Sequence, residues 1–193
     1  MNKNLIVAIA VILVLGVGGF LVFRGSGQDS TTPGASQTTK SRPVPAEVSG
    51  SFTKGQEAPD VSFTDFDGNT HNLSDFAGQA VILDYWADWC PFCRAEMPEL
   101  QAAQDKYGDD LVMVGVHRTG TESKEVGQRF ADKIGITYLL VVDPDDSLYR
   151  AAGGFGMPVA VFIDKDGVVT EIKSGPKTKE EIEEKVSRLI SSQ

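Results

Sequence analysis

The fold of this chain is decided by residues 80–93, which read AVILDYWADWCPFC. The segment from Ala80 to Ala87 is a nearly continuous apolar run of strand length, which is typical of a strand buried on both faces of a sheet. Pro91 suits the first position of a helix, and apolar residues at helical spacing continue from there to Gly108. The stretch therefore predicts a buried strand that turns directly into a helix, with two cysteines at the turn.

The rest of the soluble part alternates between strand and helix patterns. Hairpins are expected around the Asp-Gly turns in 61–73 and 159–172, strands at 111–116 and 138–142, and helices at 124–134 and 178–190. Strands that alternate with helices imply β-α-β units. The predicted class is α/β, with one mixed sheet flanked by helices and preceded by a β-hairpin.

The first 50 residues differ from this body. Leu5–Phe23 is an apolar run of 19 residues without charge or proline, long enough to cross a bilayer as a helix. A cleaved signal peptide would have a shorter apolar region and a small-residue cleavage site, and none follows Phe23. We therefore expect an uncleaved transmembrane anchor in 1–23. Residues 24–50 are rich in Ser, Thr, Gly and Pro and predict a flexible linker, which leaves 51–193 as the folded domain.

Composition excludes several functional classes. The chain has 193 residues, of which 41% are hydrophobic and 23% charged, and these proportions fit a globular domain. Its net charge of −9 disfavours nucleic-acid binding, which relies on Lys and Arg to neutralise phosphates. Two cysteines are too few for a multi-disulfide scaffold.

Cys90 and Cys93 form a Cys-x-x-Cys motif at the predicted turn from strand to helix. A helix N-terminus offers free N–H groups and a partial positive charge, which favour the thiolate that attacks disulfides. Cys90 at the cap is the predicted nucleophile, and Cys93, one turn into the helix, is expected to resolve the mixed disulfide. A structural disulfide gains only about 2 kcal/mol from so short a loop. A structural zinc site needs four ligands, and only His71 and His117 could complete it.

Other polar residues lie near this motif. Asp84 falls inside the apolar strand, where an unpaired carboxylate is costly, so we expect a raised pKa and a role in moving the proton of Cys93. Glu96 shares the helix face of Cys93, and the pattern alone also fits a solvated glutamate. His117 and Arg118 follow a predicted strand at the end where open α/β sheets place ligands, which makes a substrate-facing role a hypothesis.

These residues together resemble a known family. The run from Asp84 to Cys93, Pro98, and Met157-Pro158 before a strand are similar to the thioredoxin superfamily. The apolar N-terminus, Glu96 and the stretch GMPVAVFIDKDG at 156–167 resemble the TlpA/ResA-like, membrane-anchored thiol-disulfide oxidoreductases. Peroxiredoxins share the broader fold but carry Thr three residues before the reactive cysteine, where this chain has Ala87.

The resemblance implies roles for individual residues. Cys90 attacks, Cys93 resolves, Asp84 is the buried acid and Glu96 the active-site glutamate. Pro158 is the expected cis-proline facing the dithiol, and Met157 offers backbone pairing to a substrate. The predicted substrate-binding set is Trp89, Pro91, Phe92, Met157 and Pro158.

The sequence thus predicts a membrane-tethered, extracytoplasmic thiol-disulfide oxidoreductase that acts on protein thiols and disulfides. Because Pro91 has no N–H and nearby acids disfavour a second anion, we expect a reductant with a potential of roughly −200 to −270 mV. The dithiol is its own redox group, so no cofactor or metal is predicted. A membrane thiol donor is the expected partner, and the resemblance suggests cytochrome c maturation. The alternatives are a copper-transfer module and a disulfide-forming oxidant of the same fold.

Overall fold

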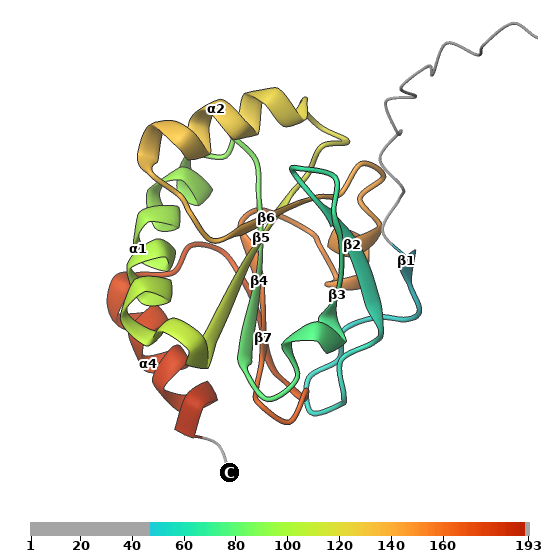
Figure 1. Ribbon diagram of the computed structural model, residues 1–193, viewed down its shortest axis with the longest axis vertical. Helices are drawn as coiled ribbons and strands as arrows, with labels where there is room; N and C mark the ends of the chain where they lie inside the picture. Colours follow the sequence, from blue (N-terminus) through green and yellow to red (C-terminus); the bar gives the residue numbers. More distant parts are fainter. Residues whose placement is uncertain (1–46, 192–193) are drawn as a thin grey trace, which may run out of the picture. The chain divides into compact units, whose positions relative to one another are not determined.

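The computed structural model describes residues 47–191, so the predicted anchor and most of the predicted linker lie outside the described residues. Within 47–191, no helix combines the length and the apolar character needed to cross a membrane. The domain is built on an eight-stranded mixed sheet in the order β1-β2-β6-β5-β4-β7-β8, with β3 paired to β2 (Figure 1). The predicted α/β class with a mixed sheet is confirmed.

The elements follow one another along the chain as expected for this class. The strands are β1 (Glu47–Val48), β2 (Val61–Asp65), β3 (Thr70–Asn72), β4 (Ala80–Trp86), β5 (Leu111–His117), β6 (Leu139–Val142), β7 (Val159–Ile163) and β8 (Val169–Ser174). The helices are α1 (Pro91–Tyr107), α2 (Lys124–Ile134), α3 (Ser147–Ala151) and α4 (Lys179–Ser191), with short 3-10 turns at Leu73–Phe76 and Gly108–Asp110.

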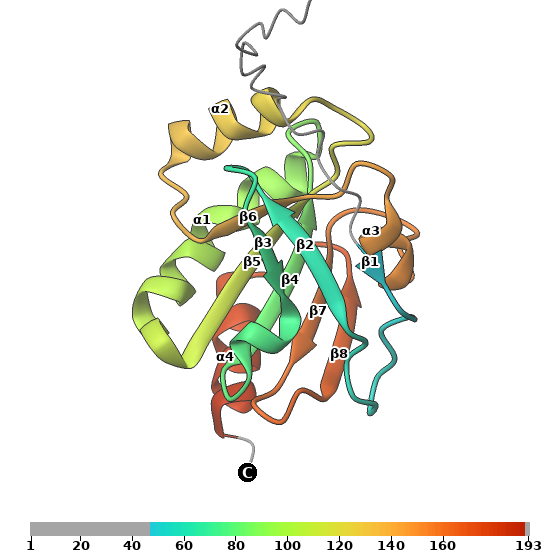
Figure 2. The same ribbon diagram turned by 45° about the vertical axis from the view of Figure 1, so that its right-hand side comes forward.

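Strand β4 lies in the middle of the sheet and is buried along its whole length. It pairs in parallel with β5 and antiparallel with β7. Its side chains alternate between two cores: Ile82 and Trp86 face the core beneath α1 and α4, whereas Leu83 and Tyr85 face the core beneath α3. Figure 1 shows α1 and α4 on one side of the sheet, and Figure 2 shows α3 on the other. The apolar run in the sequence therefore reflects burial on both faces.

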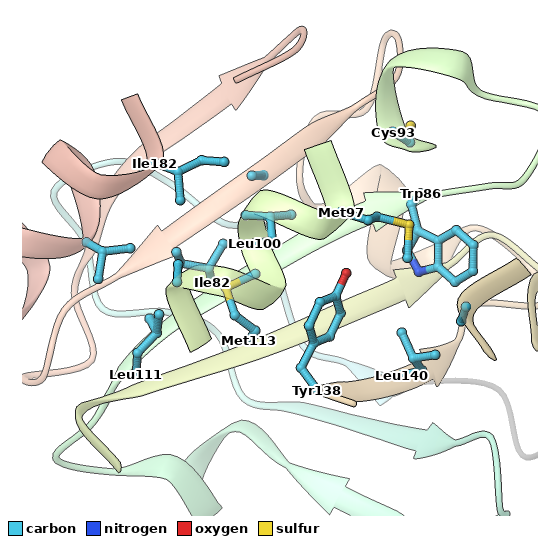
Figure 3. Packing of buried hydrophobic residues seen from close by; sticks show 14 of the residues in the cluster. Ile82, Trp86, Cys93, Met97, Leu100, Leu111, Met113, Tyr138, Leu140 and Ile182 are labelled. Atoms are coloured by element: carbon cyan, nitrogen blue, oxygen red, sulfur yellow. The ribbon is translucent and has the colours of Figure 1, made fainter. Parts of the chain in front are cut away.

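The core beneath α1 supports the segment that carries the cysteines. Figure 3 shows Met97 and Leu100 of α1 directed toward Ile82 and Trp86 of the sheet. All four of these side chains are fully buried. Removing a buried Leu side chain typically costs about 2–5 kcal/mol of stability, so this contact fixes α1 firmly on the sheet.

Most of the predicted elements are confirmed at their expected positions. The hairpin of β2 and β3 is nearest the viewer in Figure 2, and its strand β2 continues the sheet next to β6. Helix α2 ends at Gly135, whose φ of 74° is in the left-handed region that favours glycine. The predicted capping box of α4 is present. Thr178 N–H donates to Glu181 at 3.0 Å, and Glu181 N–H donates to the Thr178 hydroxyl at 3.2 Å.

Two elements differ from the sequence prediction. Glu47 and Val48, at the end of the predicted linker, form β1 because they pair with β2 opposite Ser62 and Val61. Helix α3 was not predicted. It is too short to show a periodic pattern. Its first turn is stabilised by the buried carboxylate of Asp143, a residue before the helix, which accepts hydrogen bonds from the backbone N–H groups of Leu148 and Tyr149 at 3.3 and 2.9 Å.

Candidate active site

The two cysteines lie where β4 gives way to α1. Cys90 is the N-cap of α1 and Pro91 its first residue. Cys90 and Cys93 are joined by a disulfide, and the backbone N–H of Cys93 donates to Cys90 Sγ at 3.2 Å. Cys93 is fully buried, whereas Cys90 keeps 2% of its surface exposed. Cys90 at the N-cap is thus the less enclosed of the two cysteines, which fits the predicted order of a nucleophile followed by a shielded resolving thiol.

Aromatic side chains flank this dithiol on the surface. Trp89 and Phe92 are 53% and 57% exposed, which is unusual for large apolar side chains. Trp89 is held in place, since its indole N–H donates to the Thr121 hydroxyl at 3.1 Å. Pro91, between them, is also exposed. The predicted substrate-binding residues around the motif are thus accessible to another protein.

The Met157-Pro158 peptide bond is cis, as the family resemblance implied. In the pairing of β4 with β7, Val159 lies opposite Tyr85, so Pro158 falls beside Trp86 at the end of the sheet from which the Cys-x-x-Cys segment leaves. The half-buried side chain of Met157 packs against the core that contains both cysteines. The Cys-x-x-Cys segment and the cis-proline, both predicted as parts of the site, therefore meet at the same end of the central strands.

Two carboxyl groups and one ammonium are buried beneath the site. Asp84 is fully buried and Glu96 is 2% exposed. Lys177 Nζ lies 3.0 Å from Glu96 Oε1 and 3.3 Å from Asp84 Oδ1. The backbone N–H of Lys177 also donates to Glu96 Oε2 at 2.9 Å. Glu96 is consequently not a solvated helix residue, and its position one turn after Cys93 makes it part of the site.

Burial controls the ionisation of this group. It raises the pKa of Asp84, against the opposing effect of the Lys177 ammonium. Burial together with the neighbouring Asp84 raises the pKa of Glu96 to about 8. Burial alone would lower the pKa of Lys177, but the two carboxyl groups raise it, so the ammonium stays charged. The predicted raised pKa of Asp84 is confirmed in direction.

With this geometry established, comparison with known proteins defines the family. The AhpC/TSA family matches residues 54–172, which include the cysteines, the buried acids and the cis-proline. This chain belongs to the AhpC/TSA family.

Relatives of this AhpC/TSA chain carry a more specific description. Thiol-disulfide oxidoreductase ResA of Geobacillus kaustophilus is 38% identical over 132 residues, which is 67% of this chain and 74% of ResA. Thioredoxin-like protein YneN of Bacillus subtilis is 35% identical over 134 residues, 69% of this chain and 78% of YneN. The predicted resemblance to ResA-like thiol-disulfide oxidoreductases, and with it the predicted enzyme class, is confirmed.

Solved structures agree on the fold. A thioredoxin family thiol:disulfide interchange protein from Chlorobium tepidum TLS superposes with a TM-score of 0.64 at 25% identity, covering 72% of this chain and 99% of that protein. The exposed lipoprotein thioredoxin Etrx1 of Streptococcus pneumoniae superposes with a TM-score of 0.59 at 30% identity, covering 67% and 99%. The AhpC/TSA chain thus has a thioredoxin-like fold, as predicted.

The hypothesis that His117 and Arg118 face a substrate is wrong. His117 is fully buried, stacks on Trp86 with ring centroids 4.5 Å apart, and lies 2.6 Å from Glu122 Oε1. Arg118 makes a bidentate pair with Asp146 at 2.9 and 2.6 Å. Both side chains therefore make internal contacts. His117 is the last residue of β5 and also lies against Gly127 of α2, where a Cβ would come within 2.4 Å of the His117 ring.

Sequence reasoning missed two residues that shape the site. Glu122 accepts the backbone N–H of Asp88 at 2.6 Å and so anchors the segment just before the dithiol. Lys177 supplies the only cation in contact with Asp84 and Glu96 among residues 47–191. Both lie in polar loops without periodicity, where a charged residue is ordinarily solvated. Only the unmatched acid inside the β4 pattern signalled that a buried cation was needed.

Proposed function

We propose that this protein is a membrane-tethered thiol-disulfide oxidoreductase that works outside the cytoplasm and reduces disulfides in other proteins. The observation that carries the proposal is the Cys90–Cys93 disulfide at the N-terminus of α1, placed at the same sheet edge as the cis Met157-Pro158 bond. The names of the ResA and YneN relatives support the activity. The apolar run at 5–23 supports the tether, and the Cys90–Cys93 disulfide supports the location, because disulfides persist mainly outside the cytoplasm.

The exchange proceeds through a mixed disulfide. In the reduced protein, the Cys90 thiolate attacks a disulfide of the target, forming one sulfur–sulfur bond and releasing one target thiolate. Cys93 then loses its proton and attacks Cys90 Sγ, which forms the Cys90–Cys93 bond and releases the second target sulfur as a thiolate. The target gains two electrons and this protein loses two. A membrane thiol donor returns the protein to its reduced form.

The substrates are protein segments that can lie across the exposed rim of the site. Trp89 and Phe92 offer apolar contacts, and the backbone of Met157 offers hydrogen bonds beside the dithiol. Cysteines of apocytochrome c are the first substrates to test, because the family resemblance points to cytochrome c maturation. Cys93→Ser is the variant suited to capturing them from intact cells.

The direction of electron flow follows from how weakly Cys90 is stabilised as a thiolate. Cys90 Sγ accepts a hydrogen bond from the backbone N–H of Cys93, whereas Pro91 has no N–H to offer. The acids beneath the site add unfavourable negative charge when both are ionised, because the single ammonium of Lys177 neutralises only one of them. We therefore expect a thiol pKa nearer to that of thioredoxin than to that of strong oxidants, and a potential of roughly −200 to −270 mV.

Equilibration of the purified protein with glutathione buffers tests this proposal. The ratio of dithiol to disulfide, measured by alkylation and mass, gives the potential directly. A value within the expected range supports a reductant. A value above about −150 mV would instead identify the oxidant alternative, and absence of any exchange with glutathione or protein disulfides would reject the activity itself.

A further inference from the structure

The segment Gly175–Lys177, which we call the lysine loop, joins β8 to α4 and contacts three parts of the candidate site. The backbone N–H of Gly175 donates to the carbonyl of Pro158 at 2.9 Å. The backbone N–H of Lys177 donates to Glu96, and its ammonium contacts both Glu96 and Asp84. One loop therefore holds the cis-proline, the acid of α1 and the acid of β4 in a fixed relation.

Stability does not account for a lysine at this place. Its side chain is completely buried, which is rare for an ammonium group. Replacing buried ion pairs by apolar residues is often neutral or stabilising, because desolvation of the charges offsets their attraction. A buried cation that contacts two acids below a reactive dithiol therefore calls for a chemical explanation.

Asp84, Glu96 and Lys177 together carry no net charge in only one combination of charged Lys177 with the two carboxyl groups. A single ammonium neutralises a single carboxylate, so ionising both Asp84 and Glu96 would leave a net negative charge in a buried place. The state with no net charge has charged Lys177, one ionised carboxyl and one protonated carboxyl. The other titratable groups that sense these acids are the buried hydroxyls of Tyr85 and Tyr138, and burial raises the pKa of both so that they stay neutral.

We propose, building on the proposed function, that Lys177 is a positioning residue that keeps one carboxylate of the Asp84–Glu96 pair ionised, ready to accept the proton of the Cys93 thiol. Glu96 lies one helical turn after Cys93 on the same face of α1. When Cys93 attacks the mixed disulfide, its proton moves to this carboxylate. The Cys90–target bond breaks, the Cys90–Cys93 bond forms, and the electron pair leaves on the target sulfur. The pair then returns its proton to the released thiolate or to water.

The role of Lys177 rests on its charge. In Lys177→Met, the two carboxyl groups share a buried site without a cation, so both are protonated at neutral pH and neither can accept a proton. In Lys177→Arg, the positive charge is kept. The matched control is Lys179→Met, which removes the same charge from an exposed position two residues along.

The first measurement uses the oxidised full-length protein and needs no substrate. Carboxyl carbons of Asp and Glu are followed by NMR across a pH series, with Asp84→Asn and Glu96→Gln to assign the two signals. We expect the lower of the two midpoints to rise by at least one pH unit in Lys177→Met and to stay unchanged in Lys179→Met. Unchanged midpoints in Lys177→Met would overturn the proposal.

The second measurement follows resolution of a preformed mixed disulfide between Cys90 and a small thiol. We expect the pH profile of Lys177→Met to move up by the same amount, so that the rate at pH 7 falls about tenfold, with recovery in Lys177→Arg. A uniform loss of rate at every pH would mark Lys177 as structural. If Lys177→Met does not fold, Lys177→Gln, which keeps hydrogen-bond donors without the charge, gives the same two readouts.

These measurements separate the two proposals. Failure of the wild type to exchange disulfides would reject the proposed function, while the titration of the oxidised protein would still show whether Lys177 sets the charge of the acids. Normal disulfide exchange by the wild type, together with an unshifted pH profile in Lys177→Met, would reject only the role of Lys177 and leave the proposed function standing.

Discussion

At the scale of single residues, the two cysteines differ in burial and therefore in task. Cys90 is the N-cap of α1 and keeps 2% of its surface exposed, whereas Cys93 lies inside the helix and is fully buried. Cys93→Ser should trap targets as mixed disulfides, because the first attack is kept and the release step is lost. Non-reducing electrophoresis of the captured complexes measures this. Trapping by Cys90→Ser and none by Cys93→Ser would reverse the two assignments.

Glu96 makes stability depend on pH in a definite direction. Its pKa rises from 4.5 to about 8 on folding, because burial and Asp84 disfavour its charge. The folded state therefore holds a proton that the unfolded chain releases. The contribution of Glu96 to stability is full below pH 4.5 and is lost as the pH rises through about 8.

Glu96→Gln should remove this dependence. The free energy of unfolding of the wild type, measured with urea at several pH values, should fall more steeply between pH 4.5 and 8 than that of the variant. Glu99→Gln, on a half-buried position of the same helix, serves as the control. Parallel curves for the wild type and Glu96→Gln would show that the Glu96 carboxyl titrates alike in both states.

At the scale of elements, α3 positions the segment that enters the cis-proline. The Tyr149 hydroxyl donates to the carbonyl of Gly156 at 2.8 Å. Gly154 lies directly on the Tyr149 ring, where a Cβ would come within 2.4 Å of a ring carbon. The guanidinium of Arg118 covers the ring at 3.8 Å from its centroid. The exposed Phe155 thus lies between Gly154 and Gly156, two residues that are held in place by their contacts with Tyr149.

Tyr149→Phe should loosen this segment while keeping the ring. We expect a loss of about 0.5–1.5 kcal/mol in stability, the usual value of one hydrogen bond. For a peptide disulfide, KM should rise more than kcat falls, because the dithiol itself is untouched. Steady-state kinetics with the wild type alongside checks this. An unchanged KM would show that the segment does not contact the substrate.

The elements were predictable to different degrees for physical reasons. Strand β4 is predictable from its apolar run, the start of helix α1 from Pro91, and the end of helix α2 from Gly135. The alternation of strands and helices implies a sheet with parallel strands, and it places the cysteines at the end of the central strand β4. The role of Lys177 could not be predicted, because its partners lie 81 residues and more away along the chain. The burial of His117 was missed because it arises from tertiary contacts with Trp86 of β4 and Gly127 of α2, which no periodic pattern in the sequence shows.

At the scale of the whole molecule, the tether and the domain should be separable. The full chain should resist carbonate extraction from membranes, because the apolar run at 5–23 matches a bilayer. A fragment that begins just before Glu47 should be soluble and active. A fragment that begins at Ser51 lacks β1, and it should be less stable by about 1 kcal/mol because the half-buried side chain of Val48 is missing. Release of the full chain by carbonate would reject the anchor.

The sequence distances within the site also bear on how the protein matures. The two cysteines are three residues apart, whereas Glu96 and Lys177 are separated by 81. During synthesis the dithiol emerges long before β7, β8 and the lysine loop exist, and contacts between distant segments form late in folding. The cysteines of a nascent chain can therefore pair or react with ordinary thiol chemistry. With the role proposed for Lys177, the protein should acquire its specialised reactivity only once β7, β8 and the lysine loop have docked, so that folding itself completes the site.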